Sequence, residues 1–366
     1  MKKTYIWAII IVLLIVIVIS YKGHNSSNSV KIGVAIPLTG NYASIGEKIK
    51  HGLDFAKQDI ESKNPGVTVD LVYEDACLPK DITSALQKLI TIDKIHVVNQ
   101  FCAIGLVPSL DITEPAKVIS VGVAANVSDL MGKSYYFSPN FAVKGNAVTI
   151  ADFAINTLHA KKVAFIYYNT QFGKDYRKSI GDRIVESGGQ IVGDEMTDLA
   201  VTDFKTNLTK IKSANPDVIF ITQLTGALAT ILKQSKDLGI TVPLVGNYQN
   251  EDATVLSTAG KSAEGFIISS ADPLILSHDT SGFKEAFQAK YNLIPDVFAS
   301  NAYDALHLEV SAYLKCNDNT DCIRSELHKV SDYQGVSGTI TIDSNGFASK
   351  PTVFKIVKDG QFVLYK

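Results

Sequence analysis

Side chains that commonly carry covalent or metal chemistry are few and scattered in this 366-residue sequence. It contains no Gly-x-Ser-x-Gly nucleophile elbow and no His-Glu-x-x-His zinc pair, and its seven histidines are spread along the chain. His51 and His307 each stand alone, where helix-surface exposure or packing is commoner than catalysis. We therefore expect no catalytic residue, no metal site and no cofactor. An exported α/β enzyme stays open only by analogy of fold.

The four cysteines, Cys77, Cys102, Cys316 and Cys322, are the other reactive side chains. An even number of cysteines favours disulfide bonds in an exported protein, because thiols oxidise there. Free or metal-bound thiols are the alternative, but neither spacing resembles the Cys-x-x-Cys pair of a zinc site.

The N-terminal segment predicts export. Two lysines precede an apolar run over Tyr5–Ile19, which is long for a signal-peptide core and shorter than the roughly 20 residues of a typical membrane span. The run ends at Ser20 without an Ala-x-Ala pattern, so cleavage and retention of residues 5–20 as a membrane anchor both stay open. Residues 1–29 are thus interpreted as a signal peptide or anchor with a short polar tether, placing the protein in the periplasm or at the cell surface.

A strand, a loop and a helix are predicted over Val30–Phe55. A short β-branched run ends at Pro37 and Gly40, and apolar residues then recur at helical spacing from Ile45 to Ile60. The loop has neither the Gly-x-Gly-x-x-Gly fingerprint of dinucleotide sites nor the Gly-Lys-Ser/Thr of a P-loop. This combination favours a cleft for a small molecule over a nucleotide site.

The rest of the chain alternates strands and helices in two series. Strand Val163–Tyr168 and helix Phe172–Ser187, for example, open the second series much as the strand and helix after Val30 open the first. Alternation of this kind predicts parallel sheets covered by helices, and ligands bind at the carboxyl ends of such strands. The net charge of −2 and the absence of a long basic run argue against a nucleic-acid partner.

An ordered series of motifs closely resembles the leucine/isoleucine/valine-binding protein family, the type I periplasmic solute receptors of ABC importers. The motifs are VKIGVAIPLTG from Val30, VYEDACLPK from Val72, YYNTQFGK from Tyr167, GKSAEG from Gly260 and GVSGTITIDSNG from Gly335. The resemblance covers roughly residues 30–366. It implies a disulfide between Cys77 and Cys102, and we expect Cys316 and Cys322 to close a second, shorter loop.

The resemblance also implies the domain organisation. Two doubly wound parallel-sheet lobes would be joined by a three-segment hinge, with crossings near Asn140, Ala271 and Gly335. The expected lobes are residues 30–140 with 272–335 for the N-lobe, and residues 141–271 with 336–366 for the C-lobe.

By the same resemblance, the N-lobe would hold a ligand carboxylate at helix N-termini, where several N–H groups lack internal partners. The family's Ser and Thr at these places correspond to Ala103 and Asn126, and Ala124 lies beside the second. Ala103 offers only its backbone, whereas Asn126 can donate a hydrogen bond. The alternative for Asn126 is a helix cap.

The remaining candidate contacts lie in the first loop, where the family's aromatic residue corresponds to Ile45, and in the C-lobe. Tyr42 would face the cleft or cap a helix, Phe172 would stack on the ligand or pack in the core, and the family's C-lobe Tyr corresponds to Leu224. The family's acidic partner for a ligand ammonium corresponds to Tyr248. Glu251 or Asp252 would have to replace it, unless both merely stabilise the N-terminus of a helix.

Together these features predict a non-enzymatic, extracytoplasmic solute receptor that closes two lobes around an amino acid, of the branched-chain type by family, or a related small organic ligand. Its partners would be that ligand and the membrane subunits of an ABC permease. Residues 5–20 would also contact the membrane if they are not cleaved. The alternatives are a membrane-anchored sensory domain and a receptor for amides or other ligands that lack an ammonium group.

Overall fold

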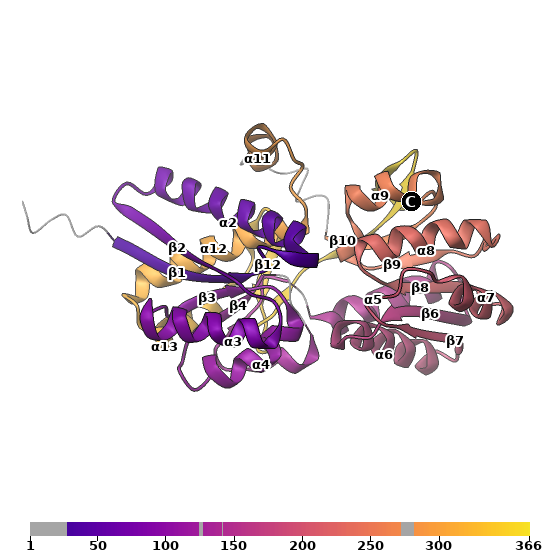
Figure 1. Ribbon diagram of the computed structural model, residues 1–366, viewed down its shortest axis with the longest axis horizontal. Coiled ribbons are helices and arrows are strands. Elements are labelled where there is room, and N and C mark those ends of the chain that lie inside the picture. The colour runs from indigo at the N-terminus through magenta and orange to yellow at the C-terminus, as the bar shows by residue number, and fades with distance from the viewer. Residues whose placement is uncertain (1–27, 124–126, 141, 272–281) are drawn as a thin grey trace, which may run out of the picture.

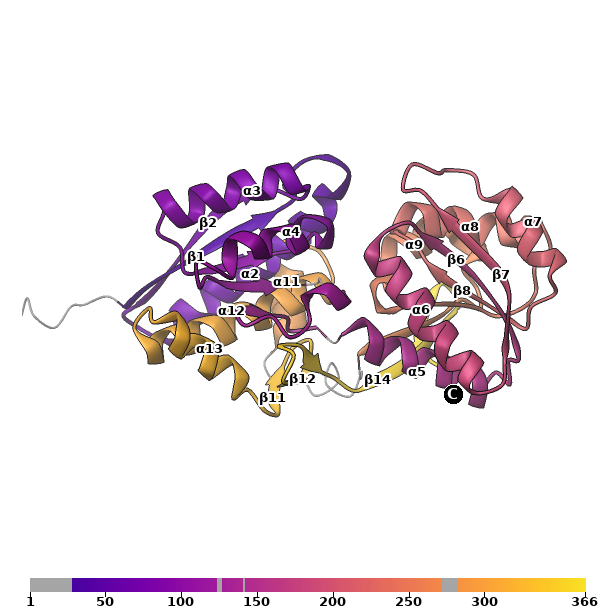
Figure 2. The ribbon, with the colours of Figure 1, turned by 90° about the horizontal axis from the view of Figure 1, so that it is seen from below.

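The chain forms two α/β lobes that lie next to each other, as the computed structural model shows for residues 28–123, 127–140, 142–271 and 282–366 (Figure 1). A view turned by 90° separates the lobes clearly, with helices covering both sheets (Figure 2). The predicted two-lobe fold is thereby confirmed.

The N-lobe is built on a parallel five-stranded sheet in the order β2-β1-β3-β4-β5. Its strands are β1 (Asn28–Ile36), β2 (Val67–Asp75), β3 (Val97–Gln100), β4 (Ile119–Gly122) and β5 (Tyr136–Phe137). Because helices cover both faces, β1 can bury a nearly continuous run of apolar residues from Val30 to Ile36. The covering helices are α2 (Ala43–Lys63), α3 (Pro79–Gln87), α4 (Ala103–Thr113), α11 (Phe283–Tyr291), α12 (Val297–Cys316) and α13 (Thr320–His328).

The C-lobe is built on a seven-stranded sheet in the order β15-β14-β10-β9-β8-β6-β7. Its parallel part consists of β6 (Lys162–Tyr168), β7 (Gln190–Thr197), β8 (Val218–Thr222), β9 (Leu244–Gly246) and β10 (Ile267–Ala271). Its helices are α5 (Val143–Asn156), α6 (Gln171–Glu186), α7 (Lys205–Ser213), α8 (Thr225–Asp237) and α9 (Ala253–Ala259).

An antiparallel hairpin completes the C-lobe sheet, where the sequence predicted parallel strands alone. Strands β14 (Thr352–Lys358) and β15 (Gln361–Leu364) are joined by Asp359 and Gly360, both with positive φ. An Asp-Gly pair with positive φ is typical of a two-residue hairpin turn, whose twist matches that of the flanking strands. The chain therefore ends as an edge hairpin on an otherwise parallel sheet.

The last passage between the lobes lies close to Lys350. A small sheet of β11 (Tyr333–Gly335), β12 (Gly338–Ile342) and β13 (Ala348–Ser349) precedes it, and its apolar side chains join the N-lobe core. The sequence placed this segment in the C-lobe, with the crossing near Gly335. Segment 338–349 packs with the N-lobe instead, and the passage near Ala271 continues into residues outside the described ranges.

A network of buried polar groups fixes this last passage. Asp304 on α12 accepts hydrogen bonds from the backbone N–H of Val336 at 2.9 Å and of Ser337 at 2.8 Å. Lys350 donates to Asn301 Oδ1 at 2.9 Å. Because Lys350 bonds to Asn301 of α12, the chain is still held to the N-lobe where the crossing begins.

Both disulfides expected from the sequence, Cys77–Cys102 and Cys316–Cys322, are present. The first joins the start of α4 to the loop after β2.

Among the described residues, no helix is long and apolar enough to cross a membrane. The predicted signal or anchor segment, residues 1–29, lies almost wholly outside the described ranges.

Candidate ligand-binding cleft

A cavity of about 420 Å³ lies between the lobes and is lined by both. On the N-lobe side it is bounded by the loops that follow β1, β2 and β3, and on the C-lobe side by the loops that follow β6, β8 and β9. These are the carboxyl ends of parallel strands, where ligands bind in open α/β sheets. The cavity is thus the position at which this topology places a small-molecule site.

The N-lobe wall is formed by Phe101 and by the first turn of α4, with Tyr42 beside it. The residue before α4, Cys102, makes no side-chain cap, so the first N–H groups of this helix are left without a side-chain acceptor. A Cβ added to Gly105 would lie 2.2 Å from the carbonyl oxygen of Cys77. Glycine therefore permits the close packing by which the disulfide loop supports this helix terminus.

The C-lobe wall is aromatic. The rings of Tyr168 and Phe172 lie 6.2 Å apart and nearly parallel, and both side chains line the cavity. Thr170 lies between them and caps α6 by accepting a hydrogen bond from the N–H of Gly173 at 3.3 Å. Leu224, at the N-terminus of α8, and Gln249 complete this wall.

Three tyrosine hydroxyl groups from the two lobes lie close enough to interact electrostatically. Burial raises the pKa of Tyr168 well above its usual range; a hydrogen bond with Thr170 opposes the rise, and the phenols of Tyr248 and Tyr42 add to it. Burial also raises the pKa of Tyr42. The phenols of Tyr168 and Tyr42 therefore stay neutral at physiological pH and offer hydrogen bonds without charge.

Only two charged side chains line the cavity among the described residues, Asp129 and Lys174. Both are exposed and come from opposite lobes. Their charges therefore lie at the rim, where water hydrates them, and the described interior carries apolar, aromatic and neutral polar side chains but no charge.

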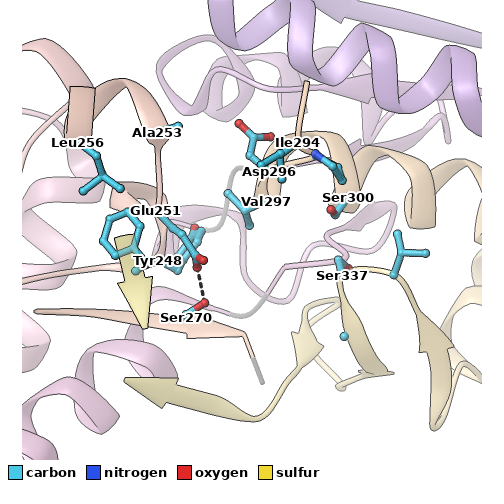
Figure 3. A pocket seen from close by; sticks show the side chains of 14 residues that line it. Tyr248, Glu251, Ala253, Leu256, Ser270, Ile294, Asp296, Val297, Ser300 and Ser337 are labelled. Carbon is cyan, nitrogen blue, oxygen red and sulfur yellow. Dashed lines mark hydrogen bonds between the residues drawn. The ribbon is translucent and has the colours of Figure 1, made fainter. Parts of the chain in front are cut away.

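Glu251 lies in a second, smaller pocket of about 220 Å³ on the hinge side of Tyr248. Its carboxylate accepts a hydrogen bond from Ser270 (Figure 3) and forms an ion pair with Lys355. Lys355 is itself 7% exposed, so the carboxylate is the partner that allows this ammonium group to be buried.

Asp252 is occupied in a different way. It caps α9 by accepting from the N–H of Thr254 at 2.8 Å, and it accepts from the hydroxyl of Thr225 at 3.1 Å. Its second oxygen lies 3.4 Å from Nζ of Lys48, which comes from the N-lobe. Burial would raise the pKa of Asp252, but Lys48 and these hydrogen bonds outweigh it and lower that pKa.

Lys48 also lies 3.0 Å from Asp296, the N-cap of α12 in its own lobe. Although burial alone would lower the pKa of Lys48, the carboxylates of Asp296 and Asp252 raise it.

On the other side of the cavity, Asp175 of α6 accepts from the N–H of Ser128 at 2.7 Å and from its hydroxyl at 3.0 Å. We call these two contacts, Lys48–Asp252 and Ser128–Asp175, the inter-lobe clasp.

The structure places the residues that the sequence singled out in three groups. Tyr42, Ala103, Phe172 and Leu224 line the cavity together. Tyr248 and Glu251 line the hinge-side pocket instead. Ala124 and Asn126 lie outside the described residues.

Sequence reasoning did not single out Phe101, Val107, Asp129, Lys174 or Gln249 as lining residues. Phe101 follows β3 directly, and Lys174 lies in the first turn of the helix that follows β6 and within the YYNTQFGK motif, so these positions were the available signal. Gln249 could not be chosen over Tyr248 without knowing how the short turn η4 (Tyr248–Asn250) is oriented.

Comparison with known proteins gives concordant matches over nearly the whole chain. The family model described as "Periplasmic binding protein" matches residues 29–361. The Leu/Ile/Val-binding protein of Citrobacter freundii is 22% identical over 87% of this chain and 88% of its own length.

Two solved structures show the same fold. The branched-chain amino acid transporter substrate-binding protein of Streptococcus pneumoniae, in complex with isoleucine, is 25% identical with a TM-score of 0.82, covering 91% of this chain and 97% of its own. An ABC transporter solute-binding protein of R. palustris, in complex with benzoate, is 20% identical with a TM-score of 0.83. The match covers 92% of this chain and 95% of that one.

Proposed function

The chain belongs to the periplasmic binding protein family, and from this premise we propose that it is an extracytoplasmic solute-binding protein for an ABC importer. It captures a small organic ligand, an amino acid or a related carboxylate, in the cavity between the lobes and delivers it to a membrane permease. The observation that carries the proposal is the cavity itself, which the carboxyl-terminal strand ends of both lobes enclose.

Binding would couple to closure of the lobes. One wall of the cavity belongs to each lobe, so a ligand contacts both only when they are together. The inter-lobe clasp then adds contacts on two sides of the cavity. In the open form the clasp contacts are broken, and the permease would distinguish the two forms by the relative position of the lobes.

Export through residues 1–29 forms part of the same proposal. Proteins of this family act outside the cytoplasmic membrane, and residues 5–20 would direct the chain there as a cleaved signal peptide or hold it there as an anchor.

A thermal-shift screen of the purified protein tests ligand capture, because a ligand that binds the native state raises the midpoint of unfolding. The panel would contain amino acids, amides, short aliphatic carboxylates and aromatic acids. A shift of several degrees with at least one class is expected. No shift with any member would contradict the proposed function.

A matched pair of variants locates the binding. Val107→Trp fills the cavity, whereas Thr241→Trp adds the same side chain at an exposed position in the loop before β9, at the end of the C-lobe sheet away from the cavity. The first should abolish the ligand-dependent shift and the second should retain it. Equal shifts in both variants would place binding outside the cavity.

A further inference from the structure

From the charges that face the cavity, we infer that its ligand is a carboxylate with a compact apolar or aromatic body and no ammonium group. This inference rests on the proposed function and narrows its ligand class. Three features support it: the pairing of the nearby acids, the helix termini that meet at the cavity, and the lining of its walls.

An enclosed ammonium group requires a negatively charged partner, because burying an unpaired charge is strongly unfavourable. Three acids adjoin the C-lobe wall in sequence: Asp175 follows Lys174, and Glu251 and Asp252 follow Gln249. Asp175 accepts hydrogen bonds from Ser128 and Gln171, and the structure also uses Glu251 and Asp252. Glu251 neutralises the buried Lys355 and faces the hinge-side pocket, as Figure 3 shows from its contact with Ser270. Turning it into the cavity would leave Lys355 buried without a counter-charge.

Asp252 already makes contacts that help to hold the two lobes together. A ligand could replace these contacts only by opposing the closure of the lobes. Its oxygens serve the N-cap of α9, the hydroxyl of Thr225 and the ammonium of Lys48. A ligand ammonium that recruited this carboxylate would have to displace Lys48 and break the contact that joins the lobes on that side.

The remaining acid of the described lining, Asp129, is exposed at the rim and faces a wall that carries the exposed Lys174. Exposed charges gain little from pairing because water screens them. The described interior of the cavity therefore presents no carboxylate to a cation.

Several helix N-termini point their positive ends at the cavity instead. Ala103 begins α4, Gln171 begins α6 and Leu224 precedes α8, and all three residues line it. Thr170 caps α6, whereas α4 and α8 have no side-chain cap. Converging helix N-termini attract anions and disfavour cations, which favours a carboxylate.

The side chains of the walls indicate the character of the rest of the ligand, apart from its carboxylate group. Tyr42, Phe101, Tyr168 and Phe172 supply aromatic rings, and Val107 and Leu224 supply aliphatic surface. Aromatic rings alone would also suit a quaternary ammonium ion, but the positive helix ends oppose that charge. A flat or branched apolar body with one anionic end satisfies both features.

Isothermal titration calorimetry with matched ligand pairs tests the inference. Leucine is compared with 4-methylpentanoate, and phenylalanine with 3-phenylpropanoate, each pair differing only in the ammonium group; benzoate is added as a compact aromatic acid. At least one carboxylate should bind tenfold or more tightly than its amino-acid counterpart. The inference is overturned if leucine or phenylalanine binds as tightly as its counterpart. It is also overturned if every ligand found in the screen has an ammonium group or lacks a carboxylate. In both cases the proposed function stands. If nothing in the full screen binds, the proposed function itself fails.

Ala103→Pro tests the role of the α4 terminus directly. Proline is tolerated as the first residue of a helix and removes its N–H, and the preceding Cys102 already has the extended conformation that proline requires, with φ −73° and ψ 110°. Carboxylate affinity should fall about tenfold. Thr320→Pro is the matched control at the first residue of α13, after Asn319 with φ −81° and ψ 108°, and should leave affinity unchanged. Equal affinity in both variants would contradict a carboxylate at α4.

Asp129→Asn separates the two ligand classes. Removing the rim carboxylate should tighten carboxylate binding a few-fold, because a like charge is removed. A tenfold loss of affinity for the bound ligand would show that Asp129 pairs with a ligand cation, and would overturn the inference.

Discussion

Glu309 is the most deeply buried acid without a cation in the part of the chain that the structure describes, and its replacement by glutamine should change the dependence of stability on pH. It lies on α12 with 1% of its surface exposed. Asn99 of β3 donates to its Oε2 at 2.9 Å, while Oε1 has no hydrogen-bond partner among the described residues. Burial raises the pKa of Glu309 from 4.5 to about 8, against the opposing effect of the Asn99 hydrogen bond.

The magnitude follows from linkage. The folded protein holds this proton up to about pH 8, whereas the unfolded chain releases it near pH 4.5. The contribution of Glu309 to the free energy of unfolding is therefore fully present below pH 4.5 and is lost as the pH rises to 8. At about 1.36 kcal/mol per pKa unit, the loss between pH 5 and pH 8 is roughly 3–4 kcal/mol.

Glu309→Gln should remove this loss, because glutamine has the shape of the protonated acid, keeps an acceptor for Asn99 and does not ionise. The variant and the wild type are expected to be about equally stable at pH 5, and the variant about 3 kcal/mol more stable at pH 8. Urea unfolding followed by far-ultraviolet circular dichroism, without reductant, measures the difference at both pH values.

Asp321→Asn serves as the control. Hydrogen bonds from Tyr135 and Lys117 lower the pKa of the exposed Asp321, so this group is charged at both pH values in the folded and the unfolded state. Its replacement should shift the free energy of unfolding equally at pH 5 and pH 8. A Glu309→Gln effect that is also equal at both pH values would refute the reasoning about the buried proton.

Other contacts lead to further expectations. Lys48→Met removes one side of the clasp and should increase the radius of gyration measured by small-angle X-ray scattering; an unchanged curve would show that the clasp does not hold the lobes. Gly52→Ala places a Cβ 2.2 Å from a carbonyl oxygen of α12 and should lower stability by about 1–3 kcal/mol. Gly145→Ala, which meets open space on α5, should raise stability by up to about 1 kcal/mol in the same thermal unfolding assay; the opposite order would contradict the packing. Replacing Cys77 and Cys102 by alanine opens a loop of sequence separation 25 and should lower the free energy of unfolding by about 3–4 kcal/mol, read from urea midpoints.

The sequence predicted most local elements closely, because their signals are local. The predicted strand Val163–Tyr168 differs from β6 by one residue at its start, and helix Phe172–Ser187 differs from α6 by one residue at each end. The antiparallel β14 and the packing of segment 338–349 against the N-lobe depend on contacts between distant parts of the chain. A periodic pattern carries no information about the direction of the neighbouring strand.

The candidate site was predictable where a single rule applies. Tyr42, Ala103, Phe172 and Leu224 each lie at or next to the start of a helix that follows a strand, so the topology brings them to one edge. Tyr248 follows the same rule but lies in a turn closed by two asparagine caps: Asn250 Oδ1 accepts from the N–H of Asn247 at 3.0 Å. This turn buries the ring of Tyr248 and leaves Gln249 to line the cavity.

Lys48 links the choice of ligand to the closure of the lobes. When the lobes separate, Lys48 keeps Asp296 as a partner in its own lobe, and Asp252 loses its only cation among the described residues. An ammonium group that reached Asp252 in the open form would therefore find it without a cation, but closing around that ligand would force two cations onto one carboxylate. A ligand without an ammonium group allows Lys48 to return to Asp252. If the proposed ligand class is correct, the same ion pair stabilises the closed form and selects against amino acids, which is discrimination by an unfavourable contact with the competing ligand.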